Sequence, residues 1–196
     1  MAAPSAKLSE FLARLAASPC CAAITSDAHL EAALASAVSA LFILRGDGLE
    51  VRPLVVRVHA AGKLVAVHLD LVDGLRPDRA AVVWLARAGV DAVISSHGQL
   101  MPAIRREHMV GIHRLLLVRR SLLDSGLSAV ARSGADIVEI LPGVILPEVR
   151  HLLPQMDVPL LAGGFIRTAA EARAALAAGA AGVTTSTQSL WGAQLA

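Results

Sequence analysis

The sequence contains no tyrosine, and it has only three phenylalanines and two tryptophans among its 196 residues. This scarcity excludes the broad aromatic platforms on which single-strand nucleic-acid binders stack successive bases. Lysine and arginine total 18 against 16 aspartates and glutamates, which gives a formal net charge of +2 at pH 7. The dense basic field of a dedicated DNA-binding domain is therefore also missing, and any nucleic-acid surface must be local.

Cysteines and long apolar runs are also scarce. Cys20 and Cys21 are adjacent, so they do not bridge each other readily, and no second pair completes a zinc site. We expect both to be small buried hydrophobic residues. No apolar run has the eighteen or more residues of a membrane span, and the first 19 residues lack the compact apolar core of a secretory signal. We therefore expect a soluble, cytoplasmic protein without membrane contact.

What the chain does have is a repeated alternation of two kinds of segment. Hydrophobic residues make up 55% of the chain and charged residues 17%, a balance typical of an ordered protein. Short aliphatic runs alternate with longer amphipathic stretches rich in alanine and leucine. Near-continuous apolar runs are typical of parallel strands covered on both faces. The eight predicted strands are residues 21–24, 40–44, 64–70, 91–95, 112–118, 136–141, 158–164 and 181–186.

Eight strand–helix units predict an α/β fold, a closed (β/α)₈ TIM barrel that is small for its class. We expect one domain over residues 1–196, because no linker or low-complexity segment interrupts the pattern. The alternative is an open doubly wound sheet. Its glycine-rich fingerprint is missing after the first strand, where "CAAITSDAHL" contains no glycine.

Two loops near the C-terminus predict a phosphate site. The segment "AGGFIRT" (162–168) follows the seventh strand and "TTSTQS" (184–189) follows the eighth, where barrels often bind phosphate. Paired glycines let an anion approach the backbone closely, and hydroxyl and N–H groups supply donors. Thr168 and Glu171 have the spacing of a capping box. The alternative is a tight turn without a ligand. The predicted phosphate-binding residues are Gly163, Gly164, Thr184, Thr185 and Ser186.

Acidic residues near strand ends predict the other end of a ligand pocket. Asp70 follows the third strand two residues after His68, and Glu139 lies near the end of the sixth. Such carboxylates transfer protons, hold a divalent cation or accept hydrogen bonds from hydroxyl groups. The chain offers no further metal donors that we can place, so we predict no metal, no cofactor and no catalytic residue. His68 is expected to be a hydrogen-bonded residue of the barrel interior.

Five segments resemble a known family, the glycerol-3-phosphate-responsive antiterminators, which are bacterial regulators of glycerol-utilisation operons. The segments are "VHLDLVDGL" (67–75), "VISSHG" (93–98), "VEILPGV" (138–144), "LAGGFIRTAAE" (161–171) and "GVTTSTQSLW" (182–191). The resemblance implies a (β/α)₈ barrel that binds glycerol 3-phosphate and acts on leader mRNA to prevent premature termination. It also implies that Asp70 and Glu139 bind ligand hydroxyl groups, opposite the phosphate site.

The sequence departs from the family pattern at two places. His97 stands where the family usually has arginine, and the fifth strand has His113 before the retained Arg114. RNA binding would use clustered arginines against phosphates. The predicted RNA contacts are Arg105, Arg106, Arg119 and Arg120. The segment 45–63 is predicted to be a helix with a solvated charged face that includes Lys63.

A second class of function stays open on the residues alone. A phosphate-binding barrel is equally suited to an enzyme, an isomerase, synthase or phosphodiesterase acting on a small phosphorylated metabolite. The resemblance favours the regulator. The oligomeric state is open, and a homo-oligomer is among the alternatives.

Overall fold

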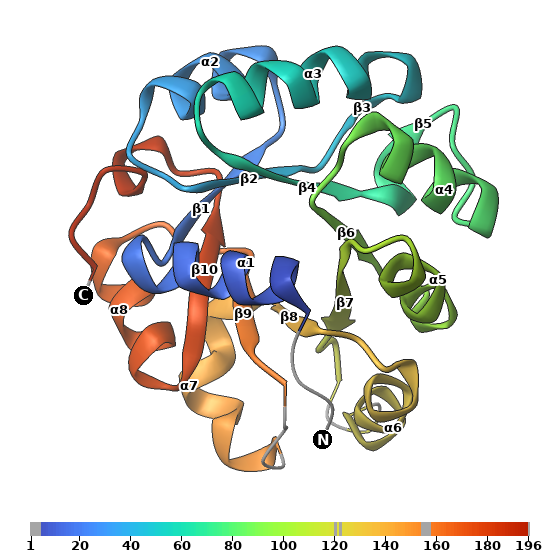
Figure 1. The fold of residues 1–196 in the computed structure, drawn as a ribbon. Helices are drawn as coiled ribbons and strands as arrows, with labels where there is room; N and C mark the ends of the chain where they lie inside the picture. Colours follow the sequence, from blue (N-terminus) through green and yellow to red (C-terminus); the bar gives the residue numbers. More distant parts are fainter. Residues whose placement is uncertain (1–4, 120, 122, 154–157, 196) are drawn as a thin grey trace.

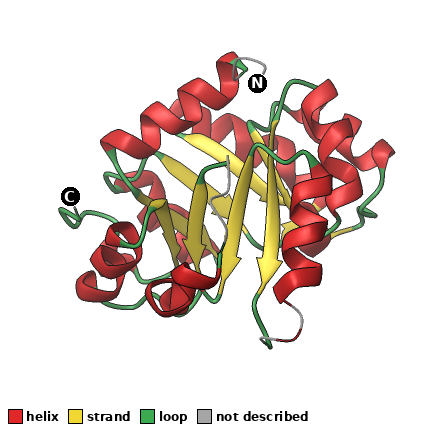
Figure 2. Ribbon diagram, turned by 90° about the horizontal axis from the view of Figure 1, so that it is seen from below, coloured by secondary structure: helices red, strands yellow, loops and turns green. Residues whose placement is uncertain are grey.

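The computed structural model describes residues 5–119, 121, 123–153 and 158–195. They form a closed barrel of parallel strands surrounded by helices (Figures 1 and 2). The order around the barrel is β1, β10, β9, β8, β7, β6, β4, β2, so every barrel strand pairs with its chain neighbours and the last closes on the first. The predicted (β/α)₈ fold is confirmed. The barrel strands are β1 (Cys20–Ile24), β2 (Ala40–Ile43), β4 (Leu64–His68), β6 (Ala92–Ser95), β7 (Val110–Leu116), β8 (Ile137–Leu141), β9 (Leu160–Gly163) and β10 (Ala180–Thr185).

Helices follow the strands and cover the outside of the barrel. The α-helices are α1 (Ala6–Ala17), α2 (Asp27–Ala35), α3 (Gly48–Ala60), α4 (Arg79–Ala88), α5 (Met101–Arg106), α6 (Leu123–Ser133), α7 (Leu146–Val149) and α8 (Ala169–Ala177). Short 3₁₀ helices add η1 (Leu69–Leu71), η2 (Gly98–Leu100), η4 (Gly143–Ile145), η5 (Arg150–Leu152) and η6 (Gln188–Leu190). Outside the barrel, β3 (Gly46–Asp47) pairs with β5 (Val72–Asp73). Polar N-caps explain several helix starts, since Ser5, Ser26, Asp78 and Thr168 each accept a backbone N–H.

The barrel interior changes from apolar to polar along the strands. Alternate residues of a strand point inward, so each strand contributes a short inward series. The lower positions are apolar and include Phe42, Ala66, Ile94, Ile112, Ile137 and Leu161, all of them buried. The next inward positions toward the carboxyl ends are His68, Arg114, Glu139 and Thr184, which are almost entirely shielded from solvent. The carboxyl end of the barrel is therefore a polar mouth above an apolar core.

Helix α1 closes the opposite end of the barrel. It lies across the amino ends of the strands, in front of the barrel in the view of Figure 1. Its buried face consists of Leu8, Phe11 and Leu15, which pack into the interior cluster. The ring of Phe11 lies 6.4 Å from the ring of Phe42, centroid to centroid. The helix therefore supplies the lower wall of the core.

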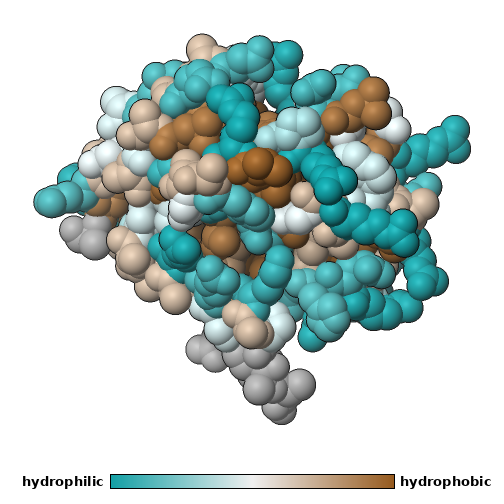
Figure 3. Space-filling model, turned by 45° about the horizontal axis from the view of Figure 1, so that its top comes forward, coloured by the Kyte–Doolittle hydropathy of each residue, from teal (hydrophilic) through white to brown (hydrophobic). Residues whose placement is uncertain are grey.

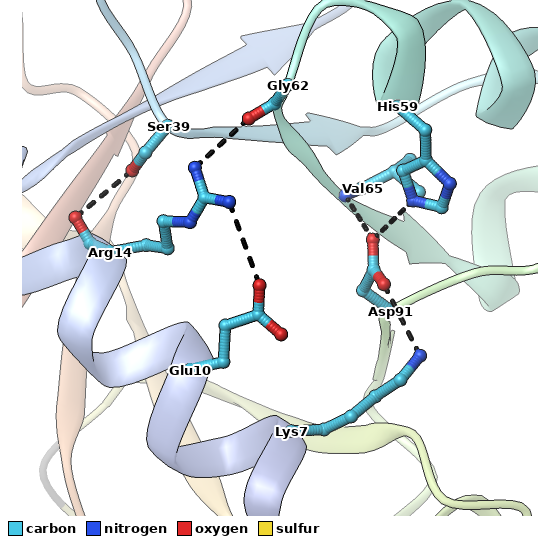
Figure 4. A network of polar contacts seen from close by, with 8 residues as sticks. All are labelled: Lys7, Glu10, Arg14, Ser39, His59, Gly62, Val65 and Asp91. Atoms are coloured by element: carbon cyan, nitrogen blue, oxygen red, sulfur yellow. Dashed lines mark hydrogen bonds and ion pairs between the residues drawn. The ribbon is translucent and has the colours of Figure 1, made fainter.

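Polar contacts around Asp91 hold α1 and the lower rim together (Figure 4). Asp91 directly precedes β6, and one of its carboxylate oxygens lies 3.3 Å from Lys7 Nζ of α1. The other accepts the backbone N–H of Val65 at 3.0 Å and lies 2.8 Å from His59 Nε2. One buried carboxylate thus joins α1, α3, β4 and β6 at the end that faces away from the mouth.

The segment 45–63 differs in part from its prediction. Helix α3 ends at Ala60, and Lys63 lies beyond it with 8% of its surface exposed. Its ammonium group donates to the carbonyl oxygens of Ser36 and Val38 at 2.7 and 2.8 Å, and burial lowers its pKa. The prediction of a solvated charge is wrong for Lys63, because the folded chain brings two unpaired carbonyls to its side chain.

The surface over α2 and α3 is mainly polar, with apolar residues in separate spots (Figure 3). Leu49 of α3 is an apolar residue with 81% of its surface exposed. Cys20 and Cys21 are buried and form no disulfide, which confirms the expectation that they behave as small hydrophobic residues. Burial raises the pKa of Cys20 to about 12.

Candidate functional site

A cavity of about 300 Å³ opens at the carboxyl ends of the strands. Its walls come from the loops after β1, β2, β9 and β10, and its floor comes from β7, β8 and β10. The lining residues are Ala23, Thr25, Leu44, Arg114, Glu139, Leu141, Gly164, Phe165, Ile166, Arg167, Thr184, Thr185, Ser186 and Thr187. The volume lies at the lower end of the range for small-molecule sites, which suits a ligand of a few heavy atoms.

A buried ion pair forms the floor of this cavity. The Arg114 Nε atom lies 2.8 Å from Glu139 Oε2, and the Arg114 side chain is 9% exposed against 1% for Glu139. The other carboxylate oxygen accepts a hydrogen bond from the Thr184 hydroxyl at 2.8 Å. Both oxygens of Glu139 are therefore held by the protein. Arginine has five N–H donors, so the guanidinium keeps donors for a ligand.

Sequence reasoning did not assign Arg114 to the site. A signal was present, because Arg114 lies two residues after Ile112 on a strand and therefore on the same, inward face. The parallel register then places Arg114 directly beside Glu139 of the neighbouring strand. A buried arginine whose charge is balanced by a carboxylate is suited to recognise a planar or tetrahedral oxyanion, or the hydroxyl groups of a polyol.

The floor of the cavity leaves no room for a side chain at Gly163. A Cβ atom at this position would lie 2.6 Å from Glu139 Oε1 and 2.5 Å from the Thr184 hydroxyl. The glycine therefore makes room for the Glu139 carboxylate, a different reason from the close approach of a phosphate that the sequence suggested. Gly164 lines the cavity itself and has φ +83°, a conformation that glycine adopts without strain.

The capping box predicted from Thr168 and Glu171 is present. Glu171 Oε2 accepts the backbone N–H groups of Arg167 and Thr168 at 2.7 and 2.9 Å, and these bonds lower the pKa of Glu171. In return, the Thr168 hydroxyl accepts the N–H of Glu171. The start of α8 is thus occupied by its own carboxylate. An anion in this loop must bind further upstream, at residues 164–166, which line the cavity.

The second predicted loop contributes four residues to the lining, Thr184 to Thr187. The Thr184 hydroxyl is used by Glu139, and the Thr185 hydroxyl donates to the carbonyl oxygen of Ile166 at 2.6 Å. That hydroxyl also accepts the N–H of Thr187 at 3.0 Å, which joins the two loops. Ser186 is exposed at the cavity rim. The structure therefore gathers four of the predicted phosphate-binding residues, Gly164, Thr184, Thr185 and Ser186, around one cavity.

Asp70 lies outside the residues that line this cavity. Its two carboxylate oxygens accept hydrogen bonds from the Ser95 hydroxyl at 2.5 Å and the Ser96 backbone N–H at 2.7 Å. These bonds hold the loop after β6 against η1. Hydroxyl binding by Asp70 stays a prediction. In the structure, the Asp70 side chain stabilises the loop after β6 through these two hydrogen bonds.

His68 belongs to the polar layer of the barrel interior. It is 3% exposed, and its Nδ1 atom has no hydrogen-bond partner within the described residues. Burial, together with the positive charge of Arg114, lowers the pKa of His68 to about 4. The imidazole is thus neutral at physiological pH. The expected interior position is confirmed, while the expected hydrogen bond is not seen at Nδ1.

The predicted RNA-contacting arginines lie at opposite ends of the barrel. Arg105 and Arg106 end α5 and so precede β7, whereas the exposed Arg119 follows β7. A seven-residue strand separates them by roughly 20 Å. Arg105 also has partners within the protein. Its Nε atom forms an ion pair with Asp136 at 3.3 Å, and its Nη1 atom donates a hydrogen bond to the carbonyl oxygen of Gly134. Arg120 lies outside the described residues.

Comparison with known proteins agrees with the fold. Residues 20–191 match the family model described as glycerol-3-phosphate responsive antiterminator. The chain belongs to this family. A crystal structure of the glycerol uptake operon antiterminator regulatory protein from Listeria monocytogenes is 29% identical, with a TM-score of 0.84, and the match covers 89% of this chain and 95% of that one.

Other relatives extend the comparison. The uncharacterized protein YgcP of Escherichia coli is 29% identical over 174 residues, 88% of this chain and 91% of that protein. A glycerol uptake operon antiterminator-related protein from Thermotoga maritima has a TM-score of 0.78 at 24% identity, with coverage of 88% and 96%. The deoxyribose phosphate aldolase of Aeropyrum pernix, at 17% identity and a TM-score of 0.70 over 96% and 97% of the two chains, shares the fold alone.

Neither a membrane-spanning helix nor a metal-binding cluster is found among the described residues. None of their helices is both long and apolar enough to span a membrane. Their histidines, cysteines, aspartates and glutamates form no group of three or more that is placed to hold a metal ion.

Proposed function

We propose that this protein binds glycerol 3-phosphate in the cavity at the barrel mouth and, in response, acts on leader mRNA as a transcription antiterminator. The observation that carries the proposal is the composition of the cavity. A small volume is lined on one side by two phosphate-type loops and on its floor by a charge-balanced Arg114–Glu139 pair. A three-carbon phosphate matches both ends, because it has one dianionic group and two hydroxyl groups.

The contacts suggest how this ligand lies. The phosphate lies against the backbone of residues 164–166 and the rim at Ser186, since Glu171 already occupies the N–H groups at the start of α8. The hydroxyl groups then point toward the floor, where the guanidinium of Arg114 offers donors and the oxygens of Glu139 offer further lone pairs. Hydroxyl recognition, which the resemblance assigned to Asp70 and Glu139, is thereby shared by Arg114 and Glu139.

We further propose that the protein does not turn its ligand over. Aldolases that work through a Schiff base need a lysine beside the bound carbonyl. The sequence has two lysines, Lys7 and Lys63. Lys7 lies in α1, which covers the amino ends of the strands, and the ammonium group of Lys63 is bonded to backbone carbonyls just before β4. Both lie at the end of the barrel opposite the cavity, so the shared fold does not carry aldolase chemistry here.

Two measurements test the ligand. Glycerol 3-phosphate at a hundred times its dissociation constant should add about 2.7 kcal/mol to the folded state and raise Tm by roughly 5–10 °C. A shift with sugar phosphates or nucleotides and none with glycerol 3-phosphate would contradict the proposal. Phosphorus NMR of the protein with candidate phosphates and divalent cations should show no turnover. Steady product formation that is lost in Glu139→Gln would favour the enzyme.

The RNA step is tested with a transcribed leader of a glycerol-utilisation operon. Glycerol 3-phosphate should strengthen binding to this RNA over a scrambled control, because a ligand shifts an equilibrium through its different affinities for two states. Gly164→Val should abolish the effect, since a β-branched residue is strained at φ +83° and displaces the loop. Gly192→Val is the matched control, because a Cβ there meets nothing within 4 Å. Equal RNA binding with and without ligand would reject the antiterminator.

A further inference from the structure

One aromatic side chain stands apart from the others in its exposure. Phe11, Phe42 and Trp191 are at most 2% exposed, and Trp84 is half-buried, whereas Phe165 is 66% exposed. Core packing therefore explains the other four and leaves Phe165 unexplained. The residue lies on the rim of the candidate ligand cavity, directly after Gly164.

The ring is held on a rigid base in an unusual backbone conformation. Phe165 has φ +60°, which is uncommon for a residue with a bulky side chain. The residues that follow are anchored: Ile166 is buried and its carbonyl oxygen accepts the Thr185 hydroxyl at 2.6 Å. The capping box then holds the backbone at Arg167. The left-handed turn is thus kept by its surroundings, and it presents the ring to solvent.

Positive charge accompanies the ring. The guanidinium carbon of Arg167 lies 5.8 Å from the centre of the Phe165 ring, and this arginine is exposed. Arg45, also exposed, is fixed nearby by a hydrogen bond from Nη1 to the carbonyl oxygen of Thr25, a residue that lines the same cavity. The carboxylates of Glu171 and Glu139 are already engaged, the first by backbone N–H groups and the second by Arg114.

We propose that Phe165 and Arg167 form a stacking site for one unpaired base of single-stranded RNA, at the rim of the ligand cavity. Unpaired bases of RNA stack on aromatic rings and on arginine planes, and arginines contact the adjacent phosphates. A single ring meets this need, although the chain lacks aromatics for a broad platform. The proposal rests on the proposed function, and it replaces the distant Arg105 and Arg106 as the centre of the RNA contact.

The position of the ring also accounts for the response to ligand. Residues 164–166 line the cavity and carry the Phe165 side chain, so a phosphate bound to this segment fixes the ring and its backbone at once. The turn is already anchored at Ile166 and Arg167, and a phosphate bound to residues 164–166 adds a contact at the residue that carries the ring. Ligand occupancy thereby changes RNA affinity through one short loop.

The test uses the intact protein, a fluorescently labelled operon leader transcript and glycerol 3-phosphate. Phe165→Leu keeps an apolar side chain over the cavity and removes the aromatic face. At glycerol 3-phosphate concentrations that calorimetry shows to saturate this variant, the substitution should weaken RNA binding by about five- to a hundredfold, as expected for one stacked base. Phe165→Trp should retain RNA binding. Leu49→Ala, an exposed apolar residue on α3, is the control and should change neither affinity.

The outcomes separate this inference from the proposed function. If wild-type protein binds the leader only with ligand and Phe165→Leu binds it equally well, the antiterminator stands and the stacking site is overturned. A second result would also overturn the inference: Phe165→Leu has a weaker affinity for glycerol 3-phosphate but binds the RNA as tightly as the wild type once the ligand is saturating. The ring would then be a lid over the cavity. If the wild type binds no leader RNA, the proposed function fails, and the stacking site fails with it.

Discussion

The pair of Arg114 and Glu139 offers the sharpest quantitative prediction, because nearly all of it is removed from water. Replacing Arg114 with methionine keeps most of the side-chain length and deletes the positive charge. Glu139 is then a carboxylate at 1% exposure whose remaining polar contact within the described residues is the Thr184 hydroxyl. Breaking a buried pair from one side typically costs about 3–5 kcal/mol, since the partner charge stays desolvated without compensation.

The double variant shows whether that cost comes from the unpaired charge. In Arg114→Met/Glu139→Gln no charge is left in the floor, so most of the penalty should disappear and the two single effects should not add. We expect a coupling energy of about 1–3 kcal/mol from the double-mutant cycle. For a chain of this length, the Arg114→Met loss corresponds to a fall in Tm of roughly 6–20 °C. Urea unfolding of the four proteins at pH 7 measures both quantities.

The same variants report on the ligand. Each single variant removes a group that we place against the hydroxyl end of glycerol 3-phosphate, so the stabilisation by ligand should fall in both. Gly192→Ala, at a glycyl position with open space around it, serves as the control for ligand response. If Arg114→Met unfolds within about 1 kcal/mol of the wild type and the cycle is additive, the pair is solvated and the reasoning from its burial is wrong.

Two further predictions follow from the polar layer. Because the pKa of His68 is lowered to about 4 in the folded protein from an unfolded value near 6.5, the unfolded chain takes up the proton first on acidification. Stability should therefore fall by roughly 3 kcal/mol between pH 6.5 and pH 4, and His68→Leu should flatten this part of the pH profile of urea unfolding. Gly163→Ala should lower the free energy of unfolding by about 1–3 kcal/mol, because its methyl group overlaps Glu139 and Thr184. The control Gly192→Ala should stay near wild type. Equal stability of the two variants would refute the assigned role of Gly163.

Much of the fold was predictable because barrel strands carry a local signal. Each strand of a parallel barrel is buried on both sides, so its apolar run is visible without knowledge of its neighbours. All eight predicted runs coincide with barrel strands, and the T-x-x-E spacing at Thr168 forms the expected cap. The place of the two C-terminal loops was also predictable, because a loop that follows a barrel strand lies at the mouth of the barrel.

The details of the site depended on pairing between strands, which no local pattern reveals. Arg114 and Glu139 are 25 residues apart in the chain, and the register of two neighbouring strands brings them together. That contact also explains Gly163, whose missing side chain leaves room for the carboxylate. The side chain of Glu171 likewise occupies the N–H groups of Arg167 and Thr168 at the start of α8.

The sequence by itself therefore determined the alternating units, the closed barrel, the loops at its mouth and the family. Tertiary structure decided which polar residues face one another inside the mouth and which arginines share a surface. It also decided that α1 covers the lower end, because the apolar face of that helix is buried only when it lies across the strand ends. The physical difference is one of sequence separation. The periodicity of buried residues is visible within a single segment, whereas charge pairing requires two separate segments held at a fixed register.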